Sequence, residues 1–325
     1  MLGLRQALHA SPALTPFFVL LLVAGVFGVL LGGAFLSPFA LSLLLQQVAV
    51  VGVVGAAQTL VVLTAGIDLS VGAIMVLSSV VMGQLVFRYG MPAPLAIVCG
   101  LAVGMLIGFL NGLLVARVKL PPFIVTLGTW QAVLATNFLF SRNETIRSQD
   151  LEAEAPLLQL FGLPLQAAGA ALTLGTVAMV VLVLALHYVL EHTAWGRHVL
   201  AVGDDPAAAE LAGVNVQGTL LSVYALAGLI CAVAGWMLIG RIGSVSPTSG
   251  QTANIESITA VVIGGISLFG GRGSILGMLF GALTVGALGL GLRLAGTDPQ
   301  WTYLLIGVLM IAAVALDRWI RKAAE

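Results

Sequence analysis

The sequence predicts an all-α polytopic membrane protein with about ten transmembrane helices, some of them broken or re-entrant. Of its 325 residues, 60% are hydrophobic and only 8% are charged, and the mean hydropathy is +1.12. About a quarter of the residues of a soluble domain are charged, so this composition excludes a water-soluble fold. The 40 glycines agree with a membrane protein, because small residues let membrane helices approach closely and break inside the protein.

A helix needs roughly 20 apolar residues to cross about 30 Å of hydrocarbon, and the apolar segments of this chain are candidate spans by that length. The candidate spans are residues 14–31, 41–65, 70–87, 93–115, 122–140, 168–190, 219–239, 258–269, 275–291 and 303–316. The eighth is too short to cross alone, so we expect half a helix or a re-entrant segment there. Two polar loops, 141–166 and 191–217, interrupt what is otherwise one transmembrane domain over residues 1–325.

The basic residues set the expected orientation. If both termini are cytoplasmic, eight of the 13 Lys and Arg residues lie on the inner side and five on the outer side, in line with the positive-inside rule. Loop 141–166 is then periplasmic and loop 191–217 cytoplasmic. Arg5 before the first apolar run resembles the start of a signal peptide, but no cleavage site follows, so we expect an uncleaved first span.

A short motif that interrupts the apolar pattern occurs twice. Residues 66–72 read Gly-Ile-Asp-Leu-Ser-Val-Gly, and residues 265–271 read Gly-Ile-Ser-Leu-Phe-Gly-Gly, so four of seven positions match at an offset of 199. Interrupted hydrophobic segments at corresponding places in two halves point to a transport path. The motif therefore predicts two related halves, each with a broken helix.

Asp68 has two possible roles. Followed by Ser70, it is typical of a helix start, where a carboxylate accepts hydrogen bonds from first-turn amides; it could also contact a transported solute directly. Polar side chains within the apolar spans are costly in lipid and should face the interior of the bundle, either as links between helices or as the lining of a path for an uncharged solute. The candidate path residues are Gln58, Asp68, Ser70, Asn111 and Gln131.

The loop 191–217 contains a predicted short helix at about 206–213. Asp205 is a suitable N-cap, Pro206 suits the first helical position, and Gly213 is a plausible stop. Such a helix could fit a groove on a soluble partner or simply connect two spans. Its candidate contact residues are Asp205, Pro206, Glu210, Leu211 and Gly213.

Five ordered segments resemble one family over nearly the whole chain. They are residues 65–72, 120–128, 196–203, 208–215 and 262–274. They are similar to the permease subunits of bacterial ATP-binding-cassette sugar importers of the ribose, xylose and arabinose type, which are related to branched-chain amino-acid permeases. The resemblance implies an inner-membrane subunit that translocates a pentose or hexose and contacts its ATPase through the helix at 206–213. It also implies two ATPase subunits, a periplasmic sugar-binding protein and a second permease copy or homologue as partners.

The energy for transport is expected to come from another chain. No glycine-rich loop ending in Gly-Lys-Ser or Gly-Lys-Thr is present, so ATP and Mg²⁺ should be bound by the partner ATPase. No cofactor or metal is expected in this chain, and its balanced charge does not suggest nucleic acid. An ion-coupled secondary transporter is the rival interpretation, with Asp68, His187 and Glu256 as its only candidate ionisable groups. A membrane enzyme ranks below both, because no hydrolase motif is found.

Overall fold

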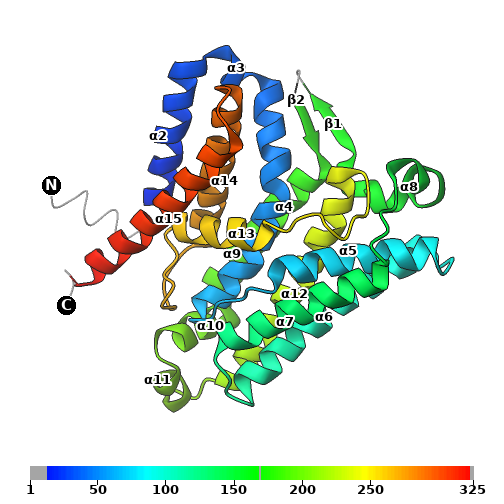
Figure 1. The fold of residues 1–325 in the computed structure, drawn as a ribbon. Coiled ribbons are helices and arrows are strands. Elements are labelled where there is room, and N and C mark those ends of the chain that lie inside the picture. The colour runs from blue at the N-terminus through cyan, green and yellow to red at the C-terminus, as the bar shows by residue number, and fades with distance from the viewer. Residues whose placement is uncertain (1–12, 168–169, 323–325) are drawn as a thin grey trace.

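The structure, a computed structural model, describes residues 13–167 and 170–322 and is mostly helical (Figure 1). Seven helices are long and apolar enough to cross a membrane: α2 (Leu14–Leu31), α4 (Pro38–Leu63), α6 (Ala93–Ala116), α7 (Pro122–Ser141), α9 (Leu174–His192), α12 (Val216–Ile242) and α14 (Ile275–Leu294). These seven confirm a polytopic membrane protein, and their bounds agree with the predicted spans to within a few residues, except at the start of α9.

Three further apolar segments are shorter. They are α5 (Val71–Phe87), α13 (Ala253–Ile263) and residues 300–312 of α15 (Pro299–Lys322). The 11 residues of α13 span only about 17 Å at 1.5 Å per residue, as expected for a segment that cannot cross alone. Ten membrane crossings, and the cytoplasmic location of both termini, remain predictions. Arg5, which was used to predict the orientation, lies outside the described residues.

The remaining elements are short. They are α3 (Gly33–Leu36), α8 (Ser148–Glu154), the 3₁₀ helix η1 (Pro156–Gly162), strands β1 (Pro164–Ala167) and β2 (Ala170–Thr173), α10 (Ala194–Asp204) and α11 (Pro206–Leu211). The predicted outer loop is therefore largely structured by α8, η1 and β1. In Figure 1, α10 and α11 lie at the opposite end of the molecule from α3 and the β-hairpin.

The predicted start of the sixth span, at residue 168, is wrong. Residues 170–173 pair with β1 in an antiparallel hairpin, and α9 begins only at Leu174, where the Thr173 side chain accepts a hydrogen bond from Thr176 N. The hairpin is tied to α4, because Ala171 N donates to Ser42 Oγ at 2.9 Å and Gln46 Nε2 donates to Ala171 O. A short apolar stretch fits a strand as well as a helix, so composition alone could not separate them.

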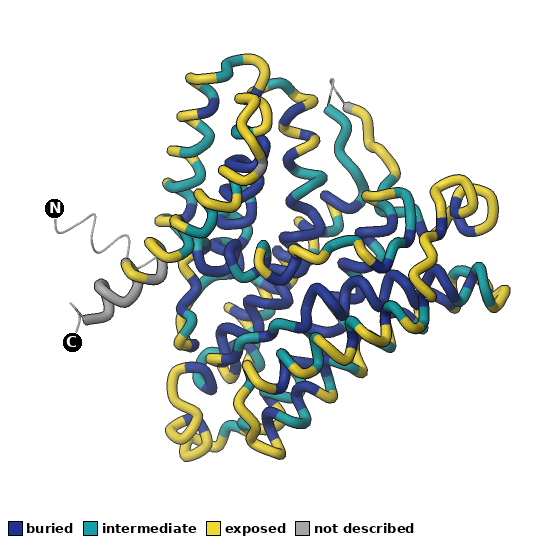
Figure 2. Tube along the Cα trace, in the orientation of Figure 1, coloured by how far each residue is buried: buried dark blue, intermediate teal, exposed yellow. Residues whose placement is uncertain are grey.

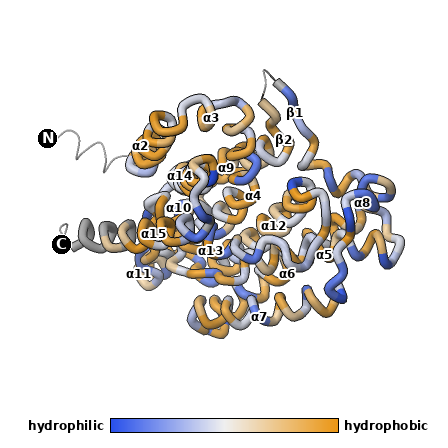
Figure 3. Tube along the Cα trace, turned by 45° about the horizontal axis from the view of Figure 1, so that its top comes forward, coloured by the Kyte–Doolittle hydropathy of each residue, from blue (hydrophilic) through white to orange (hydrophobic). Residues whose placement is uncertain are grey.

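Burial divides the helices into a central and a peripheral group (Figure 2). Most of α4, α12 and α14 is buried, whereas less than a third of α2, α6 and α7 is. The exposed side chains of the peripheral helices are nevertheless apolar, as Leu22 and Val29 on α2 illustrate. In Figure 3, hydrophobic colour covers α2 and α7, while hydrophilic colour is concentrated around α8 and β1. Apolar side chains on an outer surface are what a lipid-facing helix requires.

Glycines set the distance between α6 and α12. A Cβ on Gly108 would collide with the carbonyl oxygen of Tyr224, and a Cβ on Gly228 would collide with that of Gly104. The two backbones therefore meet directly, as in the small-residue contacts of membrane helices. This contact fixes the position of Tyr224 and of the polar residue Asn111, one turn further along α6.

Candidate functional site

The first interruption, residues 64–70 between α4 and α5, ends α4 with a left-handed turn. Ala65 has φ +59°; its amide donates to Val62 O at 2.9 Å, and the Gly66 amide donates to Val61 O at 3.1 Å. This pair of bonds is the Schellman closure of a helix C-terminus. Gly66 is required because a Cβ there would lie 2.7 Å from the Tyr224 hydroxyl.

Asp68 organises the turn that starts α5. Its Oδ1 accepts hydrogen bonds from the Ser70 amide at 2.7 Å and from Ser70 Oγ at 2.6 Å, and the residue is 1% exposed. Ser70 is the N-cap of α5, but its own side chain makes no capping bond. The carboxylate thus closes a turn of its own just before α5, whereas the sequence suggested that it would accept from the first-turn amides of the helix. A direct contact with a solute remains a prediction.

Side chains from two neighbouring helices extend this turn into a network. Asn111 Nδ2 of α6 donates to Ser70 Oγ at 3.0 Å, and Thr129 Oγ1 of α7 donates to Asn111 Oδ1 at 2.6 Å. Thr126 Oγ1 of α7 donates to the Ile67 carbonyl at 3.0 Å. The structure therefore brings together three of the five predicted path residues, Asp68, Ser70 and Asn111.

Sequence reasoning missed the two threonines. Thr126 and Thr129 are three residues apart in the apolar segment of α7, a spacing that places both on one helix face. That spacing was the available signal.

The other two predicted path residues lie outside this network. Gln58 on α4 is fully buried, and neither its Oε1 nor its Nε2 has a hydrogen-bond partner among the described residues. Gln131 on α7 is exposed, and no side-chain hydrogen bond to it is found in the described part of the chain. A buried, unpaired amide costs about 1–3 kcal/mol, so Gln58 is a position where the fold tolerates a polar group without a protein partner.

The second interruption, between α13 and α14, closes its helix in the same way. Gly265 has φ +73°; its amide donates to Val262 O at 3.0 Å, and the Ile266 amide donates to Val261 O at 3.2 Å. Gly265 thus corresponds to Ala65, an offset of 265 − 65 = 200, rather than to Gly66 as the motif match implied. The offset of 199 holds only for the next turn. There Phe269 N donates to Ser267 Oγ at 3.2 Å, just as Ser70 N donates to Asp68 Oδ1. That the two halves are related remains a prediction.

The two interruptions touch each other. The Gly271 amide donates to Leu63 O, the last residue of α4, at 3.0 Å. The Asn254 side chain at the start of α13 accepts from Gly72 N, in the first turn of α5, at 2.6 Å. The backbone carbonyl at the end of α4 and the backbone amide at the start of α5 thereby find hydrogen-bond partners in the C-terminal third of the chain.

The predicted contact helix is present as α11, Pro206–Leu211. Asp205 caps it by accepting from Ala207 N at 2.9 Å and Ala208 N at 3.1 Å, and Gly213 turns the chain with φ +86°. Leu211 at the end of the helix is 91% exposed. Whether α11 contacts a partner remains a prediction.

The preceding helix, α10, reaches both interruptions. A Cβ on Gly203 would collide with Leu63 O and would lie 2.7 Å from Gly271 N. The end of α10 therefore packs backbone to backbone against the end of α4 and the second interruption. Because α11 directly follows α10 in the chain, α10 connects it to both segments.

The chain is similar to known permeases. Residues 39–314 match the family model described as "Branched-chain amino acid transport system / permease component". The chain is 70% identical to the fructose import permease protein FrcC of Rhizobium meliloti over 99% of its own length and 89% of that protein. It is 35% identical to the ribose import permease protein RbsC of Bacillus subtilis, covering 97% and 94% of the two chains.

A third relative is the xylose transport system permease protein XylH of Haemophilus influenzae, which is 32% identical over 91% of this chain and 93% of its own. No solved structure matches. With most of its length matched, the chain belongs to the permease family of branched-chain amino acid transport systems, among relatives named as sugar permeases.

Proposed function

We propose that this chain is the membrane-spanning subunit of an ATP-binding-cassette importer and translocates a monosaccharide. The observation that carries the proposal is its 70% identity, over 99% of its length, to a fructose import permease. Fructose is therefore the first candidate, and ribose and xylose follow from the more distant relatives.

The proposed assembly has this chain paired with a second copy or a homologue in the bacterial inner membrane, with both termini cytoplasmic. ATP and Mg²⁺ are bound by separate ATPase subunits, because this sequence contains no phosphate-binding loop. A periplasmic binding protein delivers the sugar to the opposite face.

The proposed coupling path runs from α11 through α10 to the two interruptions. The exposed Leu211 and the Glu210 beside it contact the ATPase. Closure of the ATPases moves α11, and the backbone contact at Gly203 transfers the motion to Leu63 and Gly271. The Asp68 network then holds the start of α5 in place while the second interruption shifts.

Uptake by the reconstituted importer tests the proposal. Liposomes containing the permease, its ATPase and its binding protein should accumulate labelled fructose with ATP present, and vanadate should block uptake while an uncoupler does not. If the uncoupler abolishes uptake and vanadate has no effect, the chain is an ion-coupled transporter and the proposal fails.

A substitution in the coupling segment tests the path. Nothing lies within 4 Å of a Cβ on Gly213, so the side chain of Gly213→Trp meets no neighbour in the bundle, but the φ of +86° strains any residue other than glycine at this position. The substitution should prevent co-purification of the ATPase and stop uptake while permease abundance is unchanged. Gly90→Trp, at an equally open glycine of positive φ (+64°) after α5, imposes a similar backbone strain; it is the control and should leave ATPase binding intact. ATPase binding retained by Gly213→Trp would contradict the assignment.

A further inference from the structure

A cavity of about 350 Å³ adjoins the first turn of α5. Its other walls are α7 and residues 247–255, and it includes Gly72 and Ala73, which directly follow the Asp68 turn. A volume near the lower end of the range of ligand pockets, about 300–1,000 Å³, suits a small solute. The cavity lies beside the polar network without containing Asp68, Ser70 or Asn111.

One wall is irregular backbone. Residues 243–252 join α12 to α13 without a helix. Val245 pairs with Ile146 through two backbone hydrogen bonds of 2.9 and 3.1 Å, and Asn254, two residues past this segment, bonds to the start of α5. In a membrane protein, non-helical backbone is tolerated where it is buried in protein or lines an aqueous space. Segment 243–252 is non-helical and lines the cavity, as expected of backbone beside a solute path.

The lining residues are all uncharged. Three amides and a hydroxyl, those of Asn137, Gln251, Asn254 and Ser249, share the cavity with the ring of Trp130. Sugars offer hydroxyls for amides to bind and an apolar C–H face that packs on an aromatic ring. A zwitterionic amino acid would need charged partners, which this lining lacks.

Two of these amides have a donor or acceptor group without a hydrogen-bond partner among the described residues. Asn137 is 1% exposed; its Nδ2 donates to Pro247 O at 2.8 Å, but its buried Oδ1 has no partner. Asn254 uses its Oδ1 for Gly72, and its Nδ2 makes no hydrogen bond to the described residues. Two residues that line the cavity therefore carry one acceptor and one donor without a partner among the described residues.

A second cavity, on the other side of α13, differs in this respect. It measures about 360 Å³ and is lined by Glu256, Arg293 and Gln47 among others. Its charged groups already have partners: Arg293 donates to Gln47 Oε1 and to Gly289 O, and Glu256 accepts from Thr252 Oγ1. The neutral cavity is the better site for an uncharged solute.

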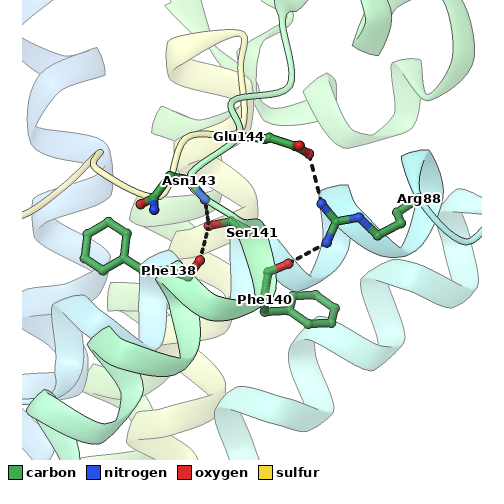
Figure 4. Close-up of polar contacts among 6 residues, drawn as sticks. All are labelled: Arg88, Phe138, Phe140, Ser141, Asn143 and Glu144. Carbon is green, nitrogen blue, oxygen red and sulfur yellow. Dashed lines mark hydrogen bonds and ion pairs between the residues drawn. The ribbon is translucent and has the colours of Figure 1, made fainter.

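The α7 wall of the neutral cavity is anchored at its end (Figure 4). Arg88 donates to Phe140 O at 2.8 Å and to Glu144 Oε2 at 2.9 Å. Ser141 Oγ donates to Phe138 O and accepts from Asn143 N. The Arg88 bonds hold the end of α7 to the end of α5, and the Ser141 bonds close the last turn of α7, so Phe138 and Asn137 keep their places in the cavity wall.

We propose that this neutral cavity is a binding station for a monosaccharide on its way through the permease. The Trp130 ring packs against the apolar face of the sugar, and the amides of Asn137 and Asn254 bind its hydroxyls. The inference rests on the proposed function, and it assigns the solute to α7 and segment 247–255, beyond the path residues that the sequence suggested.

Protection of an introduced cysteine tests the site without transport. In the purified permease–ATPase complex with Cys99→Ala and Cys231→Ala, maleimide labelling of Ser249→Cys is followed with fructose, ribose, xylose or leucine. At twice its dissociation constant a sugar should slow labelling about threefold, and leucine should not. Thr136→Cys, exposed on α7, is the control and should label at an unchanged rate.

Substitution of the ring completes the test. Trp130→Ala should remove the protection and lower uptake about tenfold, while Trp130→Phe should keep most of both. The binding station is overturned if no sugar slows the labelling of Ser249→Cys, if leucine slows it, or if the sugars slow the labelling of Thr136→Cys equally. This holds even if the wild-type importer takes up fructose. Wild-type importer that takes up no sugar, while Ser249→Cys is still protected, overturns the proposed function instead.

Discussion

The two interruptions of the bundle begin alike and are then stabilised in different ways. Each opens with the same backbone closure of the preceding helix, at Ala65 and at Gly265. In the first, residues 64–70, side chains make the subsequent bonds: a buried carboxylate, two hydroxyls and an amide drawn from three elements. In the second, residues 264–274, backbone groups bond to one another and to α4: Ser267 N donates to Arg272 O and Gly271 N to Leu63 O.

The difference indicates that the two interruptions are held in one geometry to different degrees. Side-chain bonds with buried partners fix one geometry, since each unpaired partner would cost about 1–3 kcal/mol. The second interruption has four glycines at positive φ, Gly265, Gly270, Gly271 and Gly273, and glycine adopts other backbone conformations at little cost. We therefore expect the first interruption to keep one geometry and the second to be the more adaptable of the two, although both contact α10.

The largest effect is expected where α10 meets both interruptions. Gly203→Ala places a Cβ against Leu63 O, so the backbones must separate at a cost of about 3 kcal/mol. The melting temperature of the purified permease should fall and ATP-driven uptake should be lost. Gly128→Ala, with nothing within 4 Å of its Cβ, is the matched control. A Gly203→Ala protein as stable as the control would show that α10 is not packed against the interruptions.

Substitution of Asp68 separates a structural role in the turn before α5 from contact with the solute. Asp68→Ala leaves the Ser70 amide and hydroxyl without their acceptor, which should cost about 2 kcal/mol and lower the abundance of the assembled complex. Asp68→Asn retains an acceptor oxygen and should fold. If Asp68→Asn is abundant and transports normally, Asp68 only holds the turn before α5. If it is abundant but uptake falls, the residue also acts on the solute.

A smaller loss is expected at the outer end of the side-chain network. Thr129→Val keeps the shape of the residue but removes the donor to Asn111 Oδ1, for about 1 kcal/mol of stability. Thr136→Val is the control on the same helix, because that hydroxyl is exposed and bonds only within α7. Equal melting temperatures for the two variants would argue that the network does not stiffen the first interruption.

The smallest effect is expected at Arg272. Its side chain is exposed, and its backbone carbonyl makes the bond to Ser267. Arg272→Ala should therefore change the free energy of unfolding by no more than about 0.5 kcal/mol, as ordinary surface substitutions do. Thermal unfolding beside Asp68→Ala measures the contrast between the two interruptions directly. A loss as large as that of Asp68→Ala would mean that side chains also hold the second one.

The sequence predicted the helices well because their signal is composition over about 20 residues. It also predicted Asp205 and Pro206 as the start of α11, since capping depends on neighbouring residues alone. It failed at residues 170–173, where strand formation depends on Ser42 and Gln46, more than 120 residues away.

The candidate site was only partly predictable for the same reason. Asp68 and Ser70 are neighbours, so their turn could be inferred, and buried Asn111 followed from its cost in lipid. Gln131 carries the same polar signal, yet its position on α7 leaves it exposed. Trp130, one residue away, lines the neutral cavity. Which of two adjacent residues faces inward is decided by the rotation of α7 against α5, and no local pattern reports that rotation.

The bonds between the interruptions also constrain how the chain can be made. Gly72 N is satisfied by Asn254, 182 residues further along, and Leu63 O by Gly271. While the first half is being inserted during synthesis, these groups have no partner within the bilayer, where each unpaired group is costly. The junction of α4 and α5 must therefore stay near water or an insertion factor until the last third of the chain emerges. A ribosome stalled before residue 254 should hold an N-terminal half whose helices are inserted but whose central turn is still open.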